Sequence, residues 1–130
     1  MDKNLLKQNT MSLDVSLNIK RRISYDEGKT YTEDEEEVYE SNITHNLTDM
    51  AEQAGIYESL WHPEKIGATK AKDIIEPLDK GLADLKARPE YFEKFNASNG
   101  WGTYKHFVPF VRDYLNACKE YPDATIEVSI

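Results

Sequence analysis

Between Leu13 and Ile19 every second residue is apolar, and the residues between them are polar or charged. This period of two is typical of a strand with one buried face. The same period returns over residues 125–130, and residues 38–43 form a third run with strand character. Because the first and last runs match in period and length, we expect them to pair. The pattern therefore predicts an antiparallel sheet of about three strands, two N-terminal and one C-terminal.

Helical periodicity covers most of the remaining chain, where apolar residues recur at steps of three and four. Gly55 weakens the first predicted helix by roughly 1 kcal/mol relative to Ala. Pro77 is expected to kink the second helix or to end it near Glu76. About four helices on one face of the sheet indicate the α+β class. The predicted helical segments are residues 44–62, 69–85, 91–95 and 103–120.

Length and composition favour one folded domain. The 130 residues, 39% hydrophobic and 11% aromatic, are enough for a single core. We expect a loose N-terminal arm over residues 1–10, with Met11 an alternative start, and one α+β domain over residues 11–130. The lone Cys118 excludes an intramolecular disulfide and suits a reducing compartment. Without a signal-peptide core or a membrane-spanning run, the sequence predicts a cytoplasmic protein without a membrane partner.

The net charge of −8 is concentrated in one segment. Residues 23–40 hold eight acidic side chains against Lys29 alone. We therefore expect an acidic, solvated loop at residues 23–37, because clustered like charges repel one another in a packed state. This distribution argues against direct binding of duplex nucleic acid through a broad basic face. The loop either solubilises the protein or binds a basic partner surface through Glu33, Asp34, Glu35, Glu36 and Glu37.

Polar side chains gather where the second strand runs into the first helix. The amides and the macrodipole at a helix N-terminus favour an anion. The candidate ligand-binding residues here are Asn42, Thr44, His45 and Asn46. In the alternative interpretation these residues only cap the helix and turn the chain.

A second junction of the same kind precedes the last helix. Trp101 lies between two glycines, where the backbone can approach another group closely. Its indole either stacks on a flat group such as a base or plugs the end of the core. The candidate ligand-binding residues are Asn99, Gly100, Trp101, Gly102, Thr103 and Tyr104. If both junctions face the same cleft, they form a pocket for a small anion or a nucleotide.

The sequence assigns no catalytic residue and no cofactor. It contains neither the phosphate-loop pattern nor a glycine-flanked serine. Its three histidines lack the i,i+4 pair of zinc hydrolases, so we expect no metal site. Cys118 lies on an apolar stripe, where a packed thiol is the usual finding. An enzyme with catalytic groups dispersed along the chain stays an open alternative.

Several segments together resemble small uncharacterised proteins that are common in tailed phages and prophages. They are Met11–Val15, Asn42–Leu47, Ala54–Tyr57, Gly81–Leu85, Arg88–Glu90, Asn99–Tyr104 and Tyr121–Ala124. The resemblance covers nearly everything from Met11 onward except residues 23–37. It implies a phage accessory protein in the bacterial host cytoplasm and carries no activity. Such proteins often sequester ligands or inhibit host defence enzymes.

Two functions follow as hypotheses. In the first, a phage accessory binding protein sequesters a small anionic or nucleotide ligand at the two junctions and so evades a host defence. In the alternative, the acidic segment inhibits a host nucleic-acid-binding or defence protein. A homo-oligomer that builds the pocket between subunits is compatible with either hypothesis.

Overall fold

A computed structural model describes residues 12–130 and contains a three-stranded antiparallel sheet in the order β2-β1-β3. The strands are β1 (Ser12–Ile23), β2 (Thr32–Thr44) and β3 (Thr125–Ser129). The expected pairing of the two terminal strands is confirmed, since residues 14–18 of β1 lie opposite residues 125–129 of β3. The α+β class is likewise confirmed. The predicted arm over residues 1–10 lies outside the described residues.

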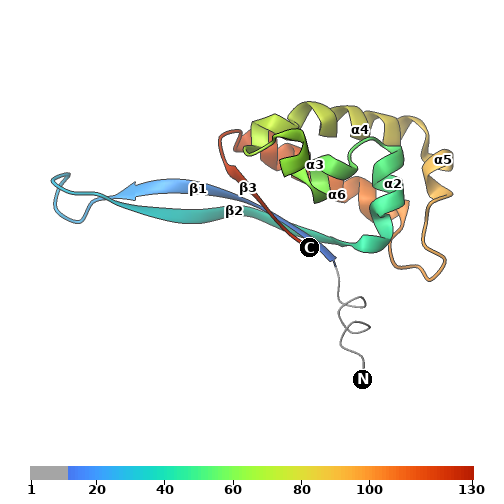
Figure 1. Ribbon diagram of the computed structural model, residues 1–130, viewed down its shortest axis with the longest axis horizontal. Coiled ribbons are helices and arrows are strands. Elements are labelled where there is room, and N and C mark those ends of the chain that lie inside the picture. Colours follow the sequence, from blue (N-terminus) through green and yellow to red (C-terminus); the bar gives the residue numbers. More distant parts are fainter. Residues whose placement is uncertain (1–11) are drawn as a thin grey trace, which may run out of the picture.

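The alternation along β1 gives the sheet one buried and one polar face. Leu13, Val15 and Leu17 are completely buried. They join the same core as the buried faces of the helices, whereas Asp14 between them is exposed. Figure 1 shows the helices gathered at one end of the sheet. Side chains from a strand and from helices therefore share one core, as the periodicity predicted.

The helical segments are shorter and more numerous than predicted. The α-helices are α2 (Thr48–Gln53), α3 (Tyr57–Trp61), α4 (Ile75–Ala87), α5 (Pro89–Glu93) and α6 (Tyr104–Glu120). Short 3-10 helices are η1 (His45–Leu47), η2 (Pro63–Ile66) and η3 (Ala71–Ile74). Helix α6 packs against α4 and β2. Within residues 12–130, none of the helices has the length and apolar character that a bilayer crossing requires.

Gly55 divides the predicted first helix. With φ +76° it takes the left-handed conformation. Its N–H donates to the carbonyl of Glu52, and the N–H of Ile56 donates to the carbonyl of Ala51. These two bonds form the glycine-terminated helix ending known as a Schellman motif. The prediction of one continuous helix over residues 44–62 is therefore wrong, because Gly55 ends α2 and redirects the chain.

Pro77 has the opposite effect from the predicted one. It is the third residue of α4, within the first turn. The N–H groups of a first turn have no carbonyl partner inside the helix, so proline loses nothing there. The segment before it, residues 71–74, is a 3-10 helix. Pro77 thus marks the beginning of α4 rather than a kink or an end.

The acidic segment is part turn and part strand, and all five acids from Glu33 to Glu37 lie in strand β2. Glu33, Asp34 and Glu35 of β2 lie opposite Arg22, Arg21 and Lys20 of β1. The turn is limited to residues 24–31. Figure 1 shows this hairpin extending well beyond the helices, and we call residues 19–37 the hairpin arm. The predicted loop is therefore confirmed for residues 24–31 and wrong for residues 33–37, which form a strand because the basic end of β1 offers opposite charges across the strands.

Tyr114 is completely buried, and its hydroxyl has no hydrogen-bond partner among the described residues. Burial, with smaller contributions from Cys118 and Tyr39, raises the pKa of Tyr114 above its usual range. An unsatisfied buried polar group costs roughly 1–3 kcal/mol. We therefore expect Tyr114→Phe to raise the free energy of unfolding by about 1 kcal/mol in urea denaturation.

Tyr104→Phe is the matched control for this prediction. The Tyr104 hydroxyl donates a hydrogen bond of 2.7 Å to the carbonyl oxygen of Leu85. Its removal should lower the free energy of unfolding by about 1 kcal/mol. If both variants lose the same stability, the Tyr114 hydroxyl has a partner and the prediction is wrong.

Candidate functional site

The two predicted junctions lie in contact. The amide nitrogen Nδ2 of Asn46 donates a hydrogen bond of 2.9 Å to the carbonyl oxygen of Trp101. A Cβ placed on Gly102 would lie 2.9 Å from Cβ of Asn46 and 3.0 Å from Cγ2 of Thr44. Only a residue without a side chain allows this approach. The structure thus joins the end of β2 to the beginning of α6.

The first junction is a turn more than a helix N-terminus. The Thr44 hydroxyl accepts the N–H of Asn46 at 3.3 Å, as expected of a cap. The helix that follows, η1, has only three residues. It runs without a break into the six-residue α2, and this short, irregular helical segment has only a small macrodipole. The physical basis of the predicted anion site is therefore weak on this side.

The second junction precedes a true helix of 17 residues. The side chain of Asn99 accepts the N–H of Trp101 at 2.9 Å. The side chain of Asn96 accepts the N–H of Tyr104, the first residue of α6, at 2.7 Å. Gly100 and Gly102 have φ angles of +78° and +100°. The chain's own asparagines therefore occupy amides that the sequence analysis assigned to a ligand.

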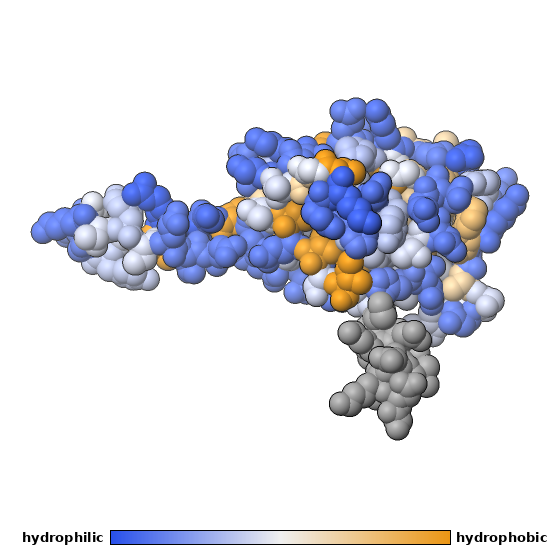
Figure 2. All heavy atoms as spheres, in the orientation of Figure 1, coloured by the Kyte–Doolittle hydropathy of each residue, from blue (hydrophilic) through white to orange (hydrophobic). Residues whose placement is uncertain are grey.

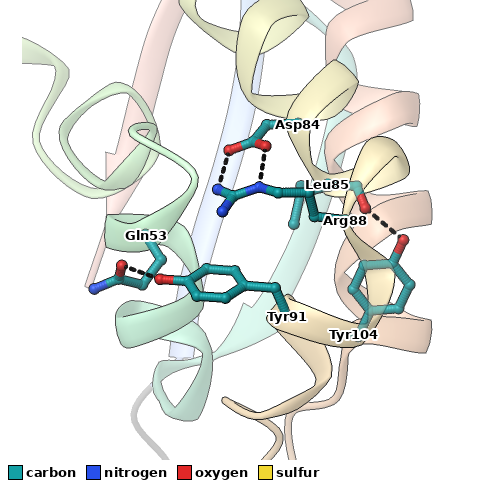
Figure 3. A network of polar contacts seen from close by, with 6 residues as sticks. All are labelled: Gln53, Asp84, Leu85, Arg88, Tyr91 and Tyr104. Atoms are coloured by element: carbon teal, nitrogen blue, oxygen red, sulfur yellow. Dashed lines mark hydrogen bonds and ion pairs between the residues drawn. The ribbon is translucent and has the colours of Figure 1, made fainter.

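An ion pair between residues four apart closes the end of α4, where α5 begins (Figure 3). Arg88 donates to both carboxylate oxygens of Asp84, at 2.7 and 2.8 Å. These hydrogen bonds hold the pKa of Asp84 below its usual range. The Arg88 guanidinium also lies 4.3 Å from the centroid of the Tyr91 ring. Tyr91 in turn donates to Gln53 at 2.7 Å.

Tyr104 belongs to the same framework rather than to a ligand site. Its hydroxyl points to the carbonyl oxygen of Leu85, near the end of α4 (Figure 3). Burial raises the pKa of Tyr104 above its usual value. The loop between α5 and α6 is therefore fixed by Tyr104 at one side and by the Asn46–Trp101 contact at the other.

A hollow of about 390 Å³ opens where the two junctions meet, and we call it the junction hollow. Ile43, Leu47 and Phe110 supply apolar contact, and the polar groups come from β2 and α6. His106, Phe110 and Asp113 lie on one stripe of α6, at spacings of four and three residues. The lining residues are Ser41, Asn42, Ile43, Thr44, Leu47, Gly102, His106, Phe110 and Asp113.

Three of the ten predicted ligand-binding residues line the junction hollow, namely Asn42, Thr44 and Gly102. The other seven are His45, Asn46, Asn99, Gly100, Trp101, Thr103 and Tyr104. Trp101 is 69% exposed, so the alternative that it plugs the core is wrong. The Thr103 hydroxyl shares a hydrogen bond of 2.9 Å with Nδ1 of His106. Thr103 thus positions a lining residue without lining the hollow itself.

His45 accepts a hydrogen bond from a core residue. Its Nδ1 accepts a hydrogen bond of 3.0 Å from the indole N–H of Trp61. Trp61 is only 1% exposed, so this contact satisfies a buried donor. Nε2 of His45 has no hydrogen-bond partner among the described residues. The histidine predicted to bind a ligand is therefore engaged in packing on its Nδ1 side.

Six lining residues were not predicted from the sequence: Ser41, Ile43, Leu47, His106, Phe110 and Asp113. Phe110 lies in the helix predicted over residues 103–120, and it is buried. The signal for the α6 group was the helical spacing of positions 106, 110 and 113 directly after the second junction. Prediction of Ser41 and Ile43 as lining residues would have required the course of β2 past α6, which local sequence does not encode.

A second hollow, of about 430 Å³, lies on the polar face of the sheet. The carboxylates of Asp14, Glu37, Glu40 and Glu127 surround it. The amide of Asn18, which is 8% exposed, donates to Glu127 at 2.8 Å. This face continues into the hairpin arm, whose β2 strand carries all five predicted partner-binding acids, Glu33 to Glu37. The protein thus has an acidic surface distinct from the junction hollow.

Comparisons with known proteins found no match for the chain. No protein-family model matches it, and neither a curated protein nor a solved structure is detectably similar. The resemblance to phage proteins therefore stays a prediction. The geometry of the two surfaces is what supports a functional proposal.

Proposed function

We propose that the protein is a binding protein that holds a small ligand in the junction hollow. The contact of Gly102 with Thr44 and Asn46 carries the proposal, because it builds one concave site from two distant segments. Apolar contact with a few convergent polar groups is the usual character of a small-molecule site. The volume of about 390 Å³ lies within the range of about 300–1,000 Å³ typical of such sites.

The charges around the hollow restrict the ligand. Asp113 contributes a carboxylate to the lining and lies 3.1 Å from Nε of Arg112. A carboxylate repels a polyphosphate, so a nucleoside or a ligand with one negative charge suits the site better. Asn42 and His106 offer hydrogen bonds to its polar groups. Trp101 precedes Gly102 but does not line the hollow, so stacking on its exposed indole requires a ligand that extends beyond the lining residues.

The cellular setting of the proposal comes from the sequence resemblance alone. In the host cytoplasm, a phage accessory protein of this kind would withdraw a nucleotide signal from a host defence enzyme. Sequestration requires only that the protein bind the signal tightly and be abundant enough to hold most of it. A site with few charged groups can meet this requirement.

Isothermal titration with nucleosides, mononucleotides, cyclic nucleotides and ADP-ribose tests the proposal. We expect one saturable class of sites, with NMR shifts at Ile43, Leu47 and Phe110. Asn42→Ala and His106→Ala should each weaken binding about fivefold, since a lost hydrogen bond costs roughly 1 kcal/mol. Asn116→Ala, an exposed substitution on α6 away from the hollow, is the matched control and should bind normally.

Two results would contradict the proposal. If no member of the panel binds, the hypothesis of a nucleotide ligand is excluded. Binding that is unchanged in both lining variants places the ligand elsewhere. Conversion of a bound ligand during the titration would show an enzyme, which chromatography of the recovered ligand detects.

A further inference from the structure

Both edges of the hairpin arm lack a strand partner among the described residues. Strand β3 pairs with β1 only over residues 14–18, so β1 beyond Ile19 has a free edge. Strand β2 is an outer strand of the sheet and pairs only with β1. Figure 1 shows the arm projecting away from the helices. Free strand edges present unpaired backbone N–H and C=O groups that a further strand can bind.

The two edges carry opposite charges. Strand β1 has Lys20, Arg21 and Arg22 in succession, and β2 has acids at all five positions from 33 to 37. Successive residues of a strand point to opposite faces. Acids therefore stand on both faces of β2, and the visible surface of the arm is mainly hydrophilic (Figure 2).

A second copy of the chain does not fit these edges in an antiparallel arrangement. Antiparallel pairing of β2 with β2 would set the acids of both copies against one another, and pairing of β1 with β1 would oppose the basic runs. Pairing of β1 with β2 of the next copy matches the charges. In antiparallel pairing, however, the helical bodies of neighbouring copies would lie at the same end of the sheet, only about 10–20 Å apart. A body of roughly 100 residues has a radius of gyration of about 13 Å, so the bodies would overlap.

We propose that the acidic edge of β2 binds a basic, extended segment of a partner protein, which adds to the sheet as a strand. The chain's own β1 is the template for this recognition. Its Lys20, Arg21 and Arg22 already lie opposite three of the acids of β2. Arg21 also forms an ion pair with Glu36. The five acids at residues 33–37 of β2 exceed the three bases of β1. The remaining negative charge can attract a second basic strand at the outer edge of β2.

The alternation of faces defines the partner further. A strand whose basic residues occupy every second position would meet only the acids of one face. Because acids stand on both faces of β2, a run of consecutive Lys and Arg residues satisfies more of them. This interaction does not involve the junction hollow, so it stands or falls independently of the proposed ligand.

A fluorescent peptide with consecutive Lys and Arg residues, flanked by Val and Thr, is the probe. Methylation of alternate backbone nitrogens gives a control peptide that keeps every charge but loses the donors of one edge. By fluorescence anisotropy with the full chain, we expect the first peptide to bind at least about tenfold more tightly than the second. NMR amide shifts should concentrate in residues 33–37.

Two protein variants test both faces of β2. One combines Glu33→Gln, Glu35→Gln and Glu37→Gln, and the other combines Asp34→Asn with Glu36→Gln. Each cross-strand charge pair contributes a factor of about 1.4 to 5, so we expect affinity losses of about tenfold and about fivefold. The matched control neutralises the exposed acids Glu52, Glu58 and Glu90 on the helical body and should change affinity less than about twofold.

Equal binding of the two peptides would overturn the proposal, since general charge attraction then suffices. Absence of binding by the first peptide would overturn it as well. A loss confined to one of the two β2 variants would indicate a partner on one face rather than a strand at the edge. Concentration-dependent dimerisation that disappears in either variant would assign the edge to a second copy.

Discussion

Trp61→Ala is expected to lower the free energy of unfolding by about 3–5 kcal/mol, the largest loss among the substitutions considered. Trp61 is 1% exposed and stacks on Tyr57 with ring centroids 5.5 Å apart. Its removal leaves a cavity that the surrounding side chains fill only in part. It also strips His45 of its hydrogen-bond donor. Urea denaturation followed by far-ultraviolet circular dichroism measures the loss.

The second tryptophan provides the control. Trp101 is 69% exposed, and Trp101→Ala should change the free energy of unfolding by less than about 0.5 kcal/mol. Trp61→Phe keeps a large ring but removes the indole N–H, which separates packing from the hydrogen bond to His45. Equal losses for Trp61→Ala and Trp101→Ala would contradict the burial that the structure assigns to the two side chains.

Gly102→Ala is expected to cost about 2–4 kcal/mol. Its φ of +100° is unfavourable for a residue with a side chain, by at least about 1 kcal/mol. The new methyl group would also lie 2.9 Å from Cβ of Asn46, and overpacking adds about 1–3 kcal/mol. The contact can relax only if the two junctions separate. We therefore expect weaker ligand binding in the junction hollow as well as lower stability.

Gly100→Ala isolates the conformational part of this effect. Gly100 has a φ of +78°, and nothing lies within 4 Å of a Cβ placed there. The expected cost is about 1–2 kcal/mol with ligand affinity unchanged. If the two alanine variants unfold at the same urea concentration, the close approach of Gly102 to the first junction is not present in solution.

Together the two surfaces describe a protein with separate binding elements. The junction hollow depends on the contact between the end of β2 and the beginning of α6. The hairpin arm depends on strand pairing beyond the body. Strand β2 belongs to both elements, because its residues 33–37 lie in the hairpin arm and Asn42 and Thr44 line the junction hollow.

Local periodicity determined most of the secondary structure. The alternation in residues 13–19 and 125–130 and the strand character of residues 38–43 predicted the three strands and the pairing of the terminal ones. The apolar stripe of residues 103–120 predicted α6 to within a residue at its beginning. These features follow from neighbouring residues, because one buried face imposes a period of two or 3.6 on the sequence.

Long-range contacts decided the rest. The acids at 33–37 became strand because Lys20, Arg21 and Arg22 face them, and charge clustering alone had predicted a loop. His45 accepts a hydrogen bond from Trp61 through Nδ1 because a buried indole N–H needs an acceptor. The sequence marked Gly102 as a place of close approach. Only the tertiary structure identifies Thr44 and Asn46 as what it approaches, since backbone contact between distant segments leaves no periodic signal.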